Sequence, residues 1–294
     1  MSSLAYTRLG QGAPLVLLHG IGLSRQSWDP VVPALARQFD VIAVDLPGFG
    51  DSPQNHATPA DAQAEPAALA RAVAVLLAEL GVTEPHVAGN SLGGWVAVEL
   101  AAIYPIASLA LLSPAGLWRR NTPAYCRVSL RASRWLTQHA AGPLSRLVNY
   151  RLGRAVVLGQ THGHPTRLTP GYARSAIATM GTCPGFDATL AATATRRCLA
   201  TTAIDAPVTV AFGSRDILLP RRLARHLDQL PPAAQEETLP GCGHVPMADD
   251  PAAVAALITR TAARAGTAGA GATGTGRTGA GRPHGAGSAC LNPA

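Results

Sequence analysis

The sequence predicts an α/β protein whose mostly parallel sheet is covered by helices on both faces and is interrupted by an inserted helical cap. Two observations support this. Short apolar runs alternate with segments of helical spacing up to residue 116 and again after residue 202. Between these stretches the alternation stops, and amphipathic, arginine-rich segments replace it.

Strands are expected where an apolar run is short and ends in a turn. The clearest runs are residues 15–18, 41–44, 108–112 and 207–212, with weaker ones at 4–9, 86–88 and 237–239. Helical spacing is found over residues 26–38, 67–80, 95–102, 220–230 and 251–264. This order of elements favours parallel strands joined by crossover helices.

The most specific local motif is a tight turn centred on Ser91. The segment Gly89-Asn90-Ser91-Leu92-Gly93 follows an expected strand and precedes an expected helix. A strained turn needs glycine two residues before and after the serine, because a side chain there would clash. The turn exposes the hydroxyl and leaves the Leu92 N–H unpaired at a helix start. Ser91 is therefore the candidate nucleophile, in preference to an ordinary glycine-rich helix start.

A nucleophilic serine needs a base to take its proton and an acid to orient that base. His244 is preferred among nine histidines, because it follows an expected strand in a glycine-flanked loop. Asp216 ends the strand that follows the insertion, and the order Ser, Asp, His suits this sheet architecture. We predict Ser91, Asp216 and His244 to form a triad rather than to be three independent structural residues.

A second glycine-rich turn, at residues 19–22, follows the first buried strand. Such a turn directs backbone N–H groups outward, so the Ile21 N–H is a candidate oxyanion donor beside that of Leu92. His19 is expected to form structural hydrogen bonds rather than to catalyse.

Other polar residues receive structural interpretations. Asp45 is expected to accept backbone N–H groups of its own loop, and Asp249 and Asp250 to cap the last helix. His162 and His164 raise the alternative of a metal pair, but no further ligand clusters nearby in the sequence. They are expected at the surface or within the insertion, and no metal is predicted.

The chain divides into a core, residues 1–116 and 203–264, and a helical cap, residues 117–202. Most large side chains of the cap are expected to pack, although some are candidates to line an apolar pocket: Tyr125, Trp135, Tyr150, Tyr172, Met180 and Phe186. Residues 265–294 are mainly Gly, Ala and Thr and are predicted to be a disordered tail, because they offer almost no large apolar surface to bury.

The positive charge is concentrated in the cap and is carried by arginine alone. Residues 117–200 contain twelve arginines and one acid, Asp187, whereas the rest of the chain contains twelve arginines and sixteen acids. One interpretation is a solvated face with a compositional bias. The other is attraction to acidic substrates or to an anionic membrane surface. Nucleic acid is not expected as a partner, since no binding motif accompanies the charge.

Composition fits one large domain with an insertion. Although 47% of residues are hydrophobic, no run of about 18 uncharged apolar residues occurs, so no membrane span is predicted. The first residues lack an apolar stretch typical of an export signal. The five cysteines are scattered without a CxxC pattern, which favours buried thiols and a cytoplasmic protein.

Five landmarks, in order, resemble those of capped serine hydrolases of the α/β-hydrolase superfamily. They are residues 19–22 with Trp28, residues 45–52, residues 89–94, residues 213–216 and residues 241–244. The resemblance covers about residues 4–264. It implies Ser91 as nucleophile, His244 as general base and then acid, Asp216 as its orienter, and the Ile21 and Leu92 N–H groups as the oxyanion hole.

The resemblance also narrows the chemistry. Family members that hydrolyse epoxides or remove halogens have aspartate where Ser91 stands. Those that hydrolyse carbon–carbon bonds are closer, but many have an aromatic residue after the histidine, where this chain has Val245.

The sequence thus predicts a cofactor-free serine hydrolase that acts on a small-molecule ester, thioester or lactone of a moderately apolar carboxylic acid. Three alternatives remain open: an acyltransferase or perhydrolase, a carbon–carbon bond hydrolase on the same triad, and a non-catalytic ligand-binding module.

Overall fold

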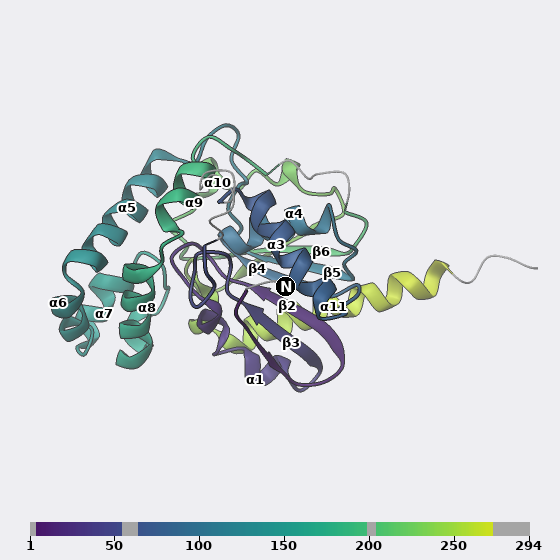
Figure 1. The fold of residues 1–294 in the computed structure, drawn as a ribbon, viewed down its shortest axis with the longest axis horizontal. Coiled ribbons are helices and arrows are strands. Elements are labelled where there is room, and N and C mark those ends of the chain that lie inside the picture. Colours follow the sequence, from purple (N-terminus) through teal and green to yellow (C-terminus); the bar gives the residue numbers. More distant parts are fainter. Residues whose placement is uncertain (1–3, 55–63, 199–203, 273–294) are drawn as a thin grey trace, which may run out of the picture.

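The computed structural model describes residues 4–54, 64–198 and 204–272. Within them lies one seven-stranded sheet in the order β1-β3-β2-β4-β5-β6-β7 (Figure 1). Only β1 pairs antiparallel with its neighbour, and the other described pairs are parallel. The strands are β1 (Tyr6–Leu9), β2 (Ala13–Leu18), β3 (Phe39–Val44), β4 (His86–Asn90), β5 (Ser108–Leu112), β6 (Val208–Gly213) and β7 (Gln235–Leu239).

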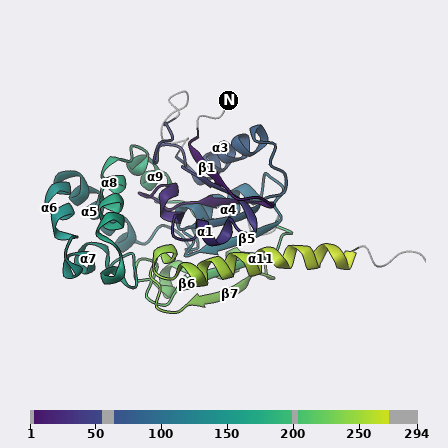
Figure 2. The same ribbon diagram turned by 90° about the horizontal axis from the view of Figure 1, so that it is seen from below.

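Helices cover both faces of the sheet (Figure 2). On one face lie α3 (Pro66–Glu79) and α4 (Leu92–Ala101), and on the other α1 (Val32–Leu35) and α11 (Pro251–Ala272). Side chains of β2 alternate between the two cores: Val16 and Leu18 pack toward α3 and α4, and Leu15 toward α1 and α11. Because β2 is buried on both sides, its sequence is a continuous apolar run. The predicted fold class is confirmed.

Two predicted helices are broken. Residues 26–38 form a 3₁₀ turn, η1 (Arg25–Trp28), and the short α1, with Pro30 between them. Residues 220–230 form α10 (Arg221–Ala224) and a second 3₁₀ turn, η3 (Leu227–Gln229). There the His226 N–H bonds to the carbonyl of Leu117 across the fold, which replaces a bond that a continuous helix would make.

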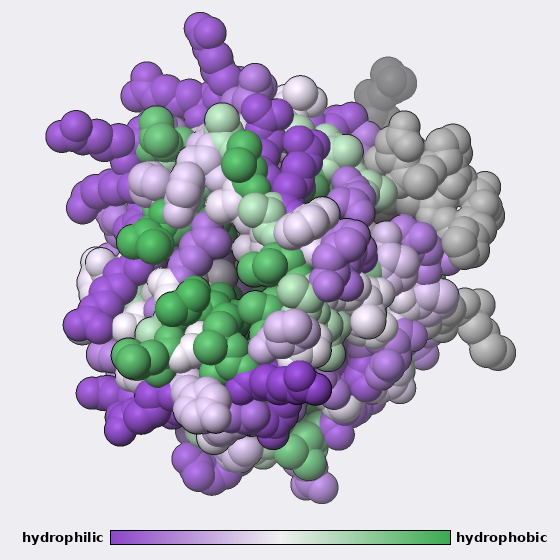
Figure 3. Space-filling model, turned by 90° about the vertical axis from the view of Figure 1, so that its left-hand side faces the viewer, coloured by the Kyte–Doolittle hydropathy of each residue, from purple (hydrophilic) through white to green (hydrophobic). Residues whose placement is uncertain are grey.

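Between β5 and β6 lies a group of helices that we call the cap helices: α5 (Ala124–His139), α6 (Ala141–Leu147), α7 (Arg151–Leu158), α8 (Pro170–Thr182) and α9 (Phe186–Thr193). They project from one end of the sheet (Figure 1), and Figure 3 views the molecule from their side. A separate small core joins α6, α7 and α8. The boundaries of core and cap as two folding units stay a prediction.

Two cap arginines are structural. Arg134 is buried and donates from Nη2 to the carbonyl of Cys183 at 2.9 Å. Arg154 is also buried, and its Nη1 donates to the carbonyl of Val148 at 2.9 Å. Both therefore use their guanidinium groups to satisfy carbonyls at the ends of cap helices, which removes them from the external charge of the cap.

The last helix is longer than expected. α11 continues to Ala272, beyond the expected helix end at Arg264. The division of the chain into core and tail stays a prediction. Alanine has the highest helix propensity, and adding residues to an existing helix avoids the cost of nucleation, so an Ala-rich segment extends it despite its glycines. Residues 273–294, the rest of the predicted tail, lie outside the described residues.

The described cysteines are buried: Cys126, Cys183, Cys198 and Cys242. This agrees with the prediction of buried thiols, and Cys290 lies outside the described residues. Of the helices in the described part of the chain, none is long and apolar enough to cross a bilayer.

Candidate active site

Ser91 lies between β4 and α4 with φ 54° and ψ −115°, a left-handed conformation that is strained for a residue with a side chain. The neighbouring glycines permit this turn. A Cβ at Gly89 would come 2.3 Å from the carbonyl oxygen of Gly93, and one at Gly93 would come 2.1 Å from that of Leu18. The steric prediction made from the motif is therefore supported by the backbone itself.

The histidine and the acid meet as the sequence predicts. His244 Nδ1 lies 3.1 Å from Asp216 Oδ2, and both side chains are almost fully buried. The other carboxylate oxygen, Oδ1, accepts the N–H groups of Leu218 and Leu219, both at 3.0 Å. With both oxygens engaged, the carboxylate is fixed in orientation, and it in turn fixes the imidazole ring.

The ionisation of Asp216 follows from these contacts. Burial alone would raise the pKa of its carboxyl, but the charge of His244, the hydrogen bond to its ring and the Leu219 N–H together lower that pKa below its ordinary value. Asp216 is thus held as an anion whose Oδ2 faces the imidazole.

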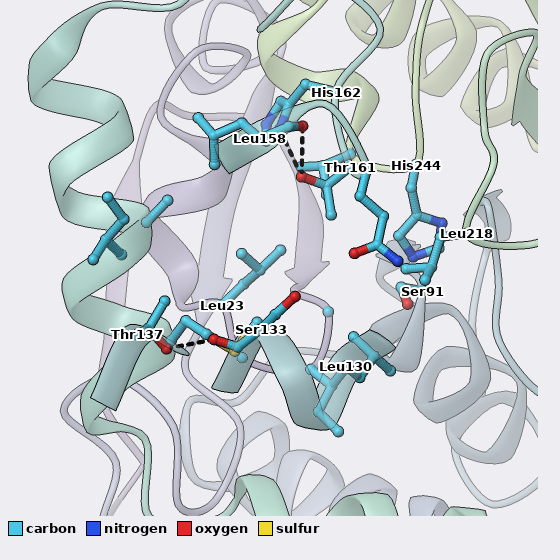
Figure 4. Close-up of a pocket in the computed structure, with 18 of the residues that line it drawn as sticks. Leu23, Ser91, Leu130, Ser133, Thr137, Leu158, Thr161, His162, Leu218 and His244 are labelled. Carbon is cyan, nitrogen blue, oxygen red and sulfur yellow. Dashed lines mark hydrogen bonds between the residues drawn. The ribbon is translucent and has the colours of Figure 1, made fainter. Parts of the chain in front are cut away.

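Ser91 and His244 border the same cavity of about 90 Å³ (Figure 4). They lie together at one end of it, and Ser133 and Thr137 of α5 lie toward the other. Most of the lining is apolar and comes from the cap helices and from the loop after β2. Among the six predicted pocket residues only Met180 lines this cavity.

A smaller cavity of about 40 Å³ adjoins the same two residues and is also bordered by Ile21 and Leu92, the predicted oxyanion pair. Leu92 is the first residue of α4, so its N–H has no acceptor within the helix. The turn that carries Ile21 approaches Ser91 closely, since a Cβ at Gly20 would come 3.2 Å from Ser91 Cβ. The fold thus gathers both predicted donors at the nucleophile.

His19 and Asp45 have the structural roles expected for them. His19 Nδ1 lies 2.8 Å from the carbonyl of Gly20, and its Nε2 accepts the Leu46 N–H at 3.0 Å. Burial lowers the pKa of His19. Asp45 accepts the backbone N–H groups of Arg25 at 2.6 Å and Asp51 at 2.9 Å.

Asp249 does not cap the last helix, and that prediction is wrong. Its Oδ2 accepts the N–H groups of Gly163 at 2.7 Å and Gly243 at 2.8 Å, and its Oδ1 accepts that of His164 at 2.9 Å. Asp250 caps the N-terminus of α11 instead, because its Oδ1 accepts the Ala253 N–H at 2.9 Å. Asp249 therefore ties the segment after α7 to the loop that carries His244.

Further contacts join the same two segments, residues 161–164 and 241–245, which we call the histidine clasp. The Val245 N–H bonds to the carbonyl of Thr161 at 2.9 Å. Arg215, which lies outside both segments and next to Asp216, also holds the first of them, because its Nη1 donates to the carbonyl of Gly163 at 2.9 Å. A Cβ at Gly163 would come 1.9 Å from the carbonyl oxygen of Gly241, so only glycine permits this approach.

His162 is buried in the clasp and lines the cavity, so of the two positions expected for it, at the surface or within the insertion, it has the second. Its Nδ1 lies 2.9 Å from Thr161 Oγ1 and its Nε2 lies 3.0 Å from the Tyr172 hydroxyl. Burial lowers its pKa to about 4, although the Asp249 carboxylate opposes the shift. Its nitrogens are therefore engaged by hydroxyls, and in the described part of the chain no cluster of three or more ligand side chains could hold a metal.

The sequence analysis also missed a role for Asn90. Its Nδ2 donates to the carbonyls of Leu112 at 3.0 Å and His244 at 2.9 Å. It thereby joins the end of β4 to β5 and to the backbone of the histidine loop. Its position next to Ser91 could have indicated a role at the site. The carbonyls of Leu112 and His244 that it bonds to are evident only from the structure.

The profile of the alpha/beta hydrolase family matches residues 15–257, and the chain belongs to this family. An uncharacterized protein of Mycobacterium tuberculosis is 30% identical over 274 residues, which cover 87% of this chain and 77% of that protein. A pimeloyl-(acyl-carrier protein) methyl ester esterase of Edwardsiella ictaluri is 30% identical over 269 residues, covering 85% of this chain and 94% of the relative.

Solved structures agree on the fold. A thermophilic esterase from Thermogutta terrifontis has a TM-score of 0.70 to this chain at 23% identity, covering 89% of this chain and 93% of the esterase. The family, together with the esterases among its relatives, defines the protein as a hydrolase.

We predict that Asp249→Asn lowers the free energy of unfolding by about 2 to 4 kcal/mol, because an amide NH₂ would face N–H donors that now bond to a charged carboxylate. Urea unfolding measures this. Asp250→Asn is the matched control and should change little, since asparagine caps a helix as well as aspartate does. Equal effects of the two substitutions would refute the clasp role of Asp249.

A second prediction concerns acid. Because burial lowers the pKa of His162 to about 4, below the ordinary 6.5, the unfolded chain binds a proton that the folded chain does not between these values. Stability contributed by neutral His162 is thus full above about pH 6.5 and is lost as the pH falls toward 4. Between pH 7 and about pH 4.5, the free energy of unfolding of the wild type should therefore fall by about 2 kcal/mol more than that of His162→Gln.

Unfolding free energies at the two pH values test this prediction. His139→Gln, at an exposed position on α5, is the control and should follow the wild type. If the free energy of unfolding of His162→Gln fell with pH as much as that of the wild type, His162 would not titrate as described.

Proposed function

We propose that the protein is a serine hydrolase that cleaves an ester, thioester or lactone of a moderately apolar carboxylic acid through an acyl-enzyme on Ser91. The observation that carries the proposal is the shared position of Ser91 and His244 at one end of an apolar cavity, with the His244 ring fixed by buried Asp216. These are the parts that nucleophilic acyl transfer requires.

In the proposed first step, Ser91 Oγ attacks the substrate carbonyl carbon while His244 Nε2 takes the hydroxyl proton. The carbonyl oxygen becomes an anion, and the N–H groups of Ile21 and Leu92 are suited to stabilise it. When the tetrahedral intermediate collapses, the carbon–oxygen or carbon–sulfur bond breaks and His244 returns the proton to the leaving group.

In the second step, water replaces the leaving group. His244 takes a proton from the water as the oxygen attacks the acyl carbon, and then returns it to Ser91 Oγ as the acyl–enzyme bond breaks. The imidazolium that forms twice in this cycle faces the Asp216 anion. The lowered pKa of Asp216 supports this role, because a neutral acid would give no such electrostatic stabilisation.

The cavity supports the proposed substrate class. Its apolar lining favours a hydrocarbon acyl group, and its volume of about 90 Å³ is smaller than the roughly 150 Å³ of a cavity that holds benzene. A short acyl chain therefore fits without rearrangement of the cap helices. The named activity of the Edwardsiella relative, a methyl ester esterase, supports an ester as the substrate.

We predict that a fluorophosphonate probe labels the wild type and that Ser91→Ala abolishes labelling and lowers ester turnover at least roughly a thousandfold. Ser133→Ala is the matched control, because Ser133 lines the same cavity but lies away from the end that Ser91 and His244 share. It should keep both labelling and turnover. Wild-type turnover in folded Ser91→Ala would contradict the proposal.

A further prediction concerns acyl length. Leu130 borders both the larger and the smaller cavity, so Leu130→Ala should join them and move the preferred p-nitrophenyl ester to a longer acyl chain. Rates across a series from acetate to dodecanoate measure this. Leu136→Ala, at an exposed position of the same helix, should leave the profile unchanged. An unchanged profile in Leu130→Ala would remove this cavity from consideration as the acyl site.

A further inference from the structure

Large apolar side chains are exposed on the outer side of the cap helices. On α5, Val128 is 65% and Trp135 is 60% exposed, and on α7, Leu152 and Val156 are each 79% exposed. Tyr150, at the start of α7, is also exposed. Isolated exposed apolar residues are ordinary, but several on two helices that both pack against α6 and α8 need an explanation.

These positions follow from helix periodicity. Val128 and Trp135 are two turns apart on α5, and Leu152 and Val156 are one turn apart on α7, so each pair shares one helix face. The opposite side of α5 carries Leu130, Ser133 and Thr137 into the cavity at Ser91. Each helix therefore has an inner face that lines the cavity and an apolar outer face that is largely exposed, although the Trp135 ring stacks on that of His139.

Arginine side chains are interspersed with this patch. Arg131 lies between Val128 and Trp135 on α5, and the exposed Arg146 and Arg151 flank the start of α7. Within the described residues, none of these three arginines has an ion-pair partner. The only acid between residues 117 and 200 is Asp187, on α9. In the part of the chain that the structure describes, the charge of this face is thus not neutralised.

Figure 3 shows this side of the molecule, with hydrophobic residues gathered around a hollow and hydrophilic residues projecting from the margin. We use the name cap face for the outer surface formed by Val128, Arg131, Trp135, Leu147, Arg146, Tyr150, Arg151, Leu152 and Val156.

We propose that the cap face binds an anionic phospholipid bilayer. Aliphatic and aromatic side chains would enter the interface between headgroups and acyl chains, where tryptophan and tyrosine are favoured. The arginines would bind lipid phosphates, for which the guanidinium group offers paired donors. Neither part suffices alone, and the cap face presents both on one surface.

Charge complementarity favours a membrane over a second copy of the chain. In a symmetric dimer through this face, the same patch would meet itself, which would place unpaired arginines near one another without acids between them. An anionic bilayer supplies the missing negative charge. It also accepts apolar side chains without requiring a matching pocket.

Binding at this face would hold the cavity of α5 and α7 near the bilayer, so esters that partition into the membrane would reach Ser91 over a short path. This last consequence rests on the proposed function, whereas membrane binding itself does not. Ser91→Ala should therefore bind vesicles like the wild type.

The test is co-sedimentation with vesicles of equal parts phosphatidylcholine and phosphatidylglycerol, compared with phosphatidylcholine alone. We expect binding to the anionic vesicles at low salt and its loss at about 0.5 M NaCl, where charge interactions are screened. Arg131→Gln with Arg151→Gln should weaken binding roughly tenfold or more. The matched control, Arg37→Gln with Arg71→Gln, removes the same charge from exposed positions on the sheet side and should bind like the wild type.

A second pair of variants tests the apolar part. Leu152→Ser with Val156→Ser should weaken vesicle binding, whereas Val75→Ser with Ile103→Ser, which changes two exposed apolar residues of the core, should not. Hydrolysis of a soluble short-chain ester should stay at the wild-type rate in all four double variants, which shows that they fold.

Absence of vesicle binding by the wild type would overturn the proposal. The proposal would also be overturned if vesicle binding fell equally in the cap-face and control variants, or if the protein bound neutral and anionic vesicles equally well. Sedimentation of the wild type could instead reveal a dimer that does not bind vesicles. If the double variant Leu152→Ser with Val156→Ser dissociated that dimer, the cap face would be assigned to a second copy of the chain.

Discussion

The left-handed turn at Ser91 is the constraint on which the candidate site depends. A strand and a helix join there without a loop, which is possible only because their backbones come closer than a Cβ allows at Gly89 and Gly93. The strain at Ser91 is offset by packing, since α4 is buried along most of its length between the sheet and α3. The same turn that brings Ser91 to the cavity also places the first N–H of α4 beside it.

The parallel sheet brings the other groups to this turn. Ile21, Asp216 and His244 follow β2, β6 and β7, and parallel strands end on the same edge of a sheet. Residues far apart in sequence thereby meet without any specific long-range signal. Short-range hydrogen bonds then set the fine geometry: Asp216 is fixed by N–H groups of its own loop, and His244 by the backbone contacts of Asn90 and the histidine clasp.

The fold and the meeting of Asp216 with His244 could be predicted because they depend on local patterns: apolar strand runs, glycine spacing and polar residues at strand ends. The clasp could not. Asp249 lies just before a helix, where an acid usually caps, and nothing local indicates that its oxygens bond to Gly163 and His164, far away in sequence. The prediction of one continuous helix over residues 220–230 was wrong for the same reason. A hydrogen bond from the His226 N–H to the carbonyl of Leu117 outweighs the local helical spacing.

The central claim is a covalent acyl-enzyme on Ser91, and it is tested most directly by rapid mixing with a p-nitrophenyl ester. We predict a burst of nitrophenol close to one equivalent per chain, and an acyl group that peptide mass spectrometry of the quenched protein locates on Ser91. Linear release without a burst, together with no acylated peptide after quenching of the wild-type protein during turnover, would contradict the account.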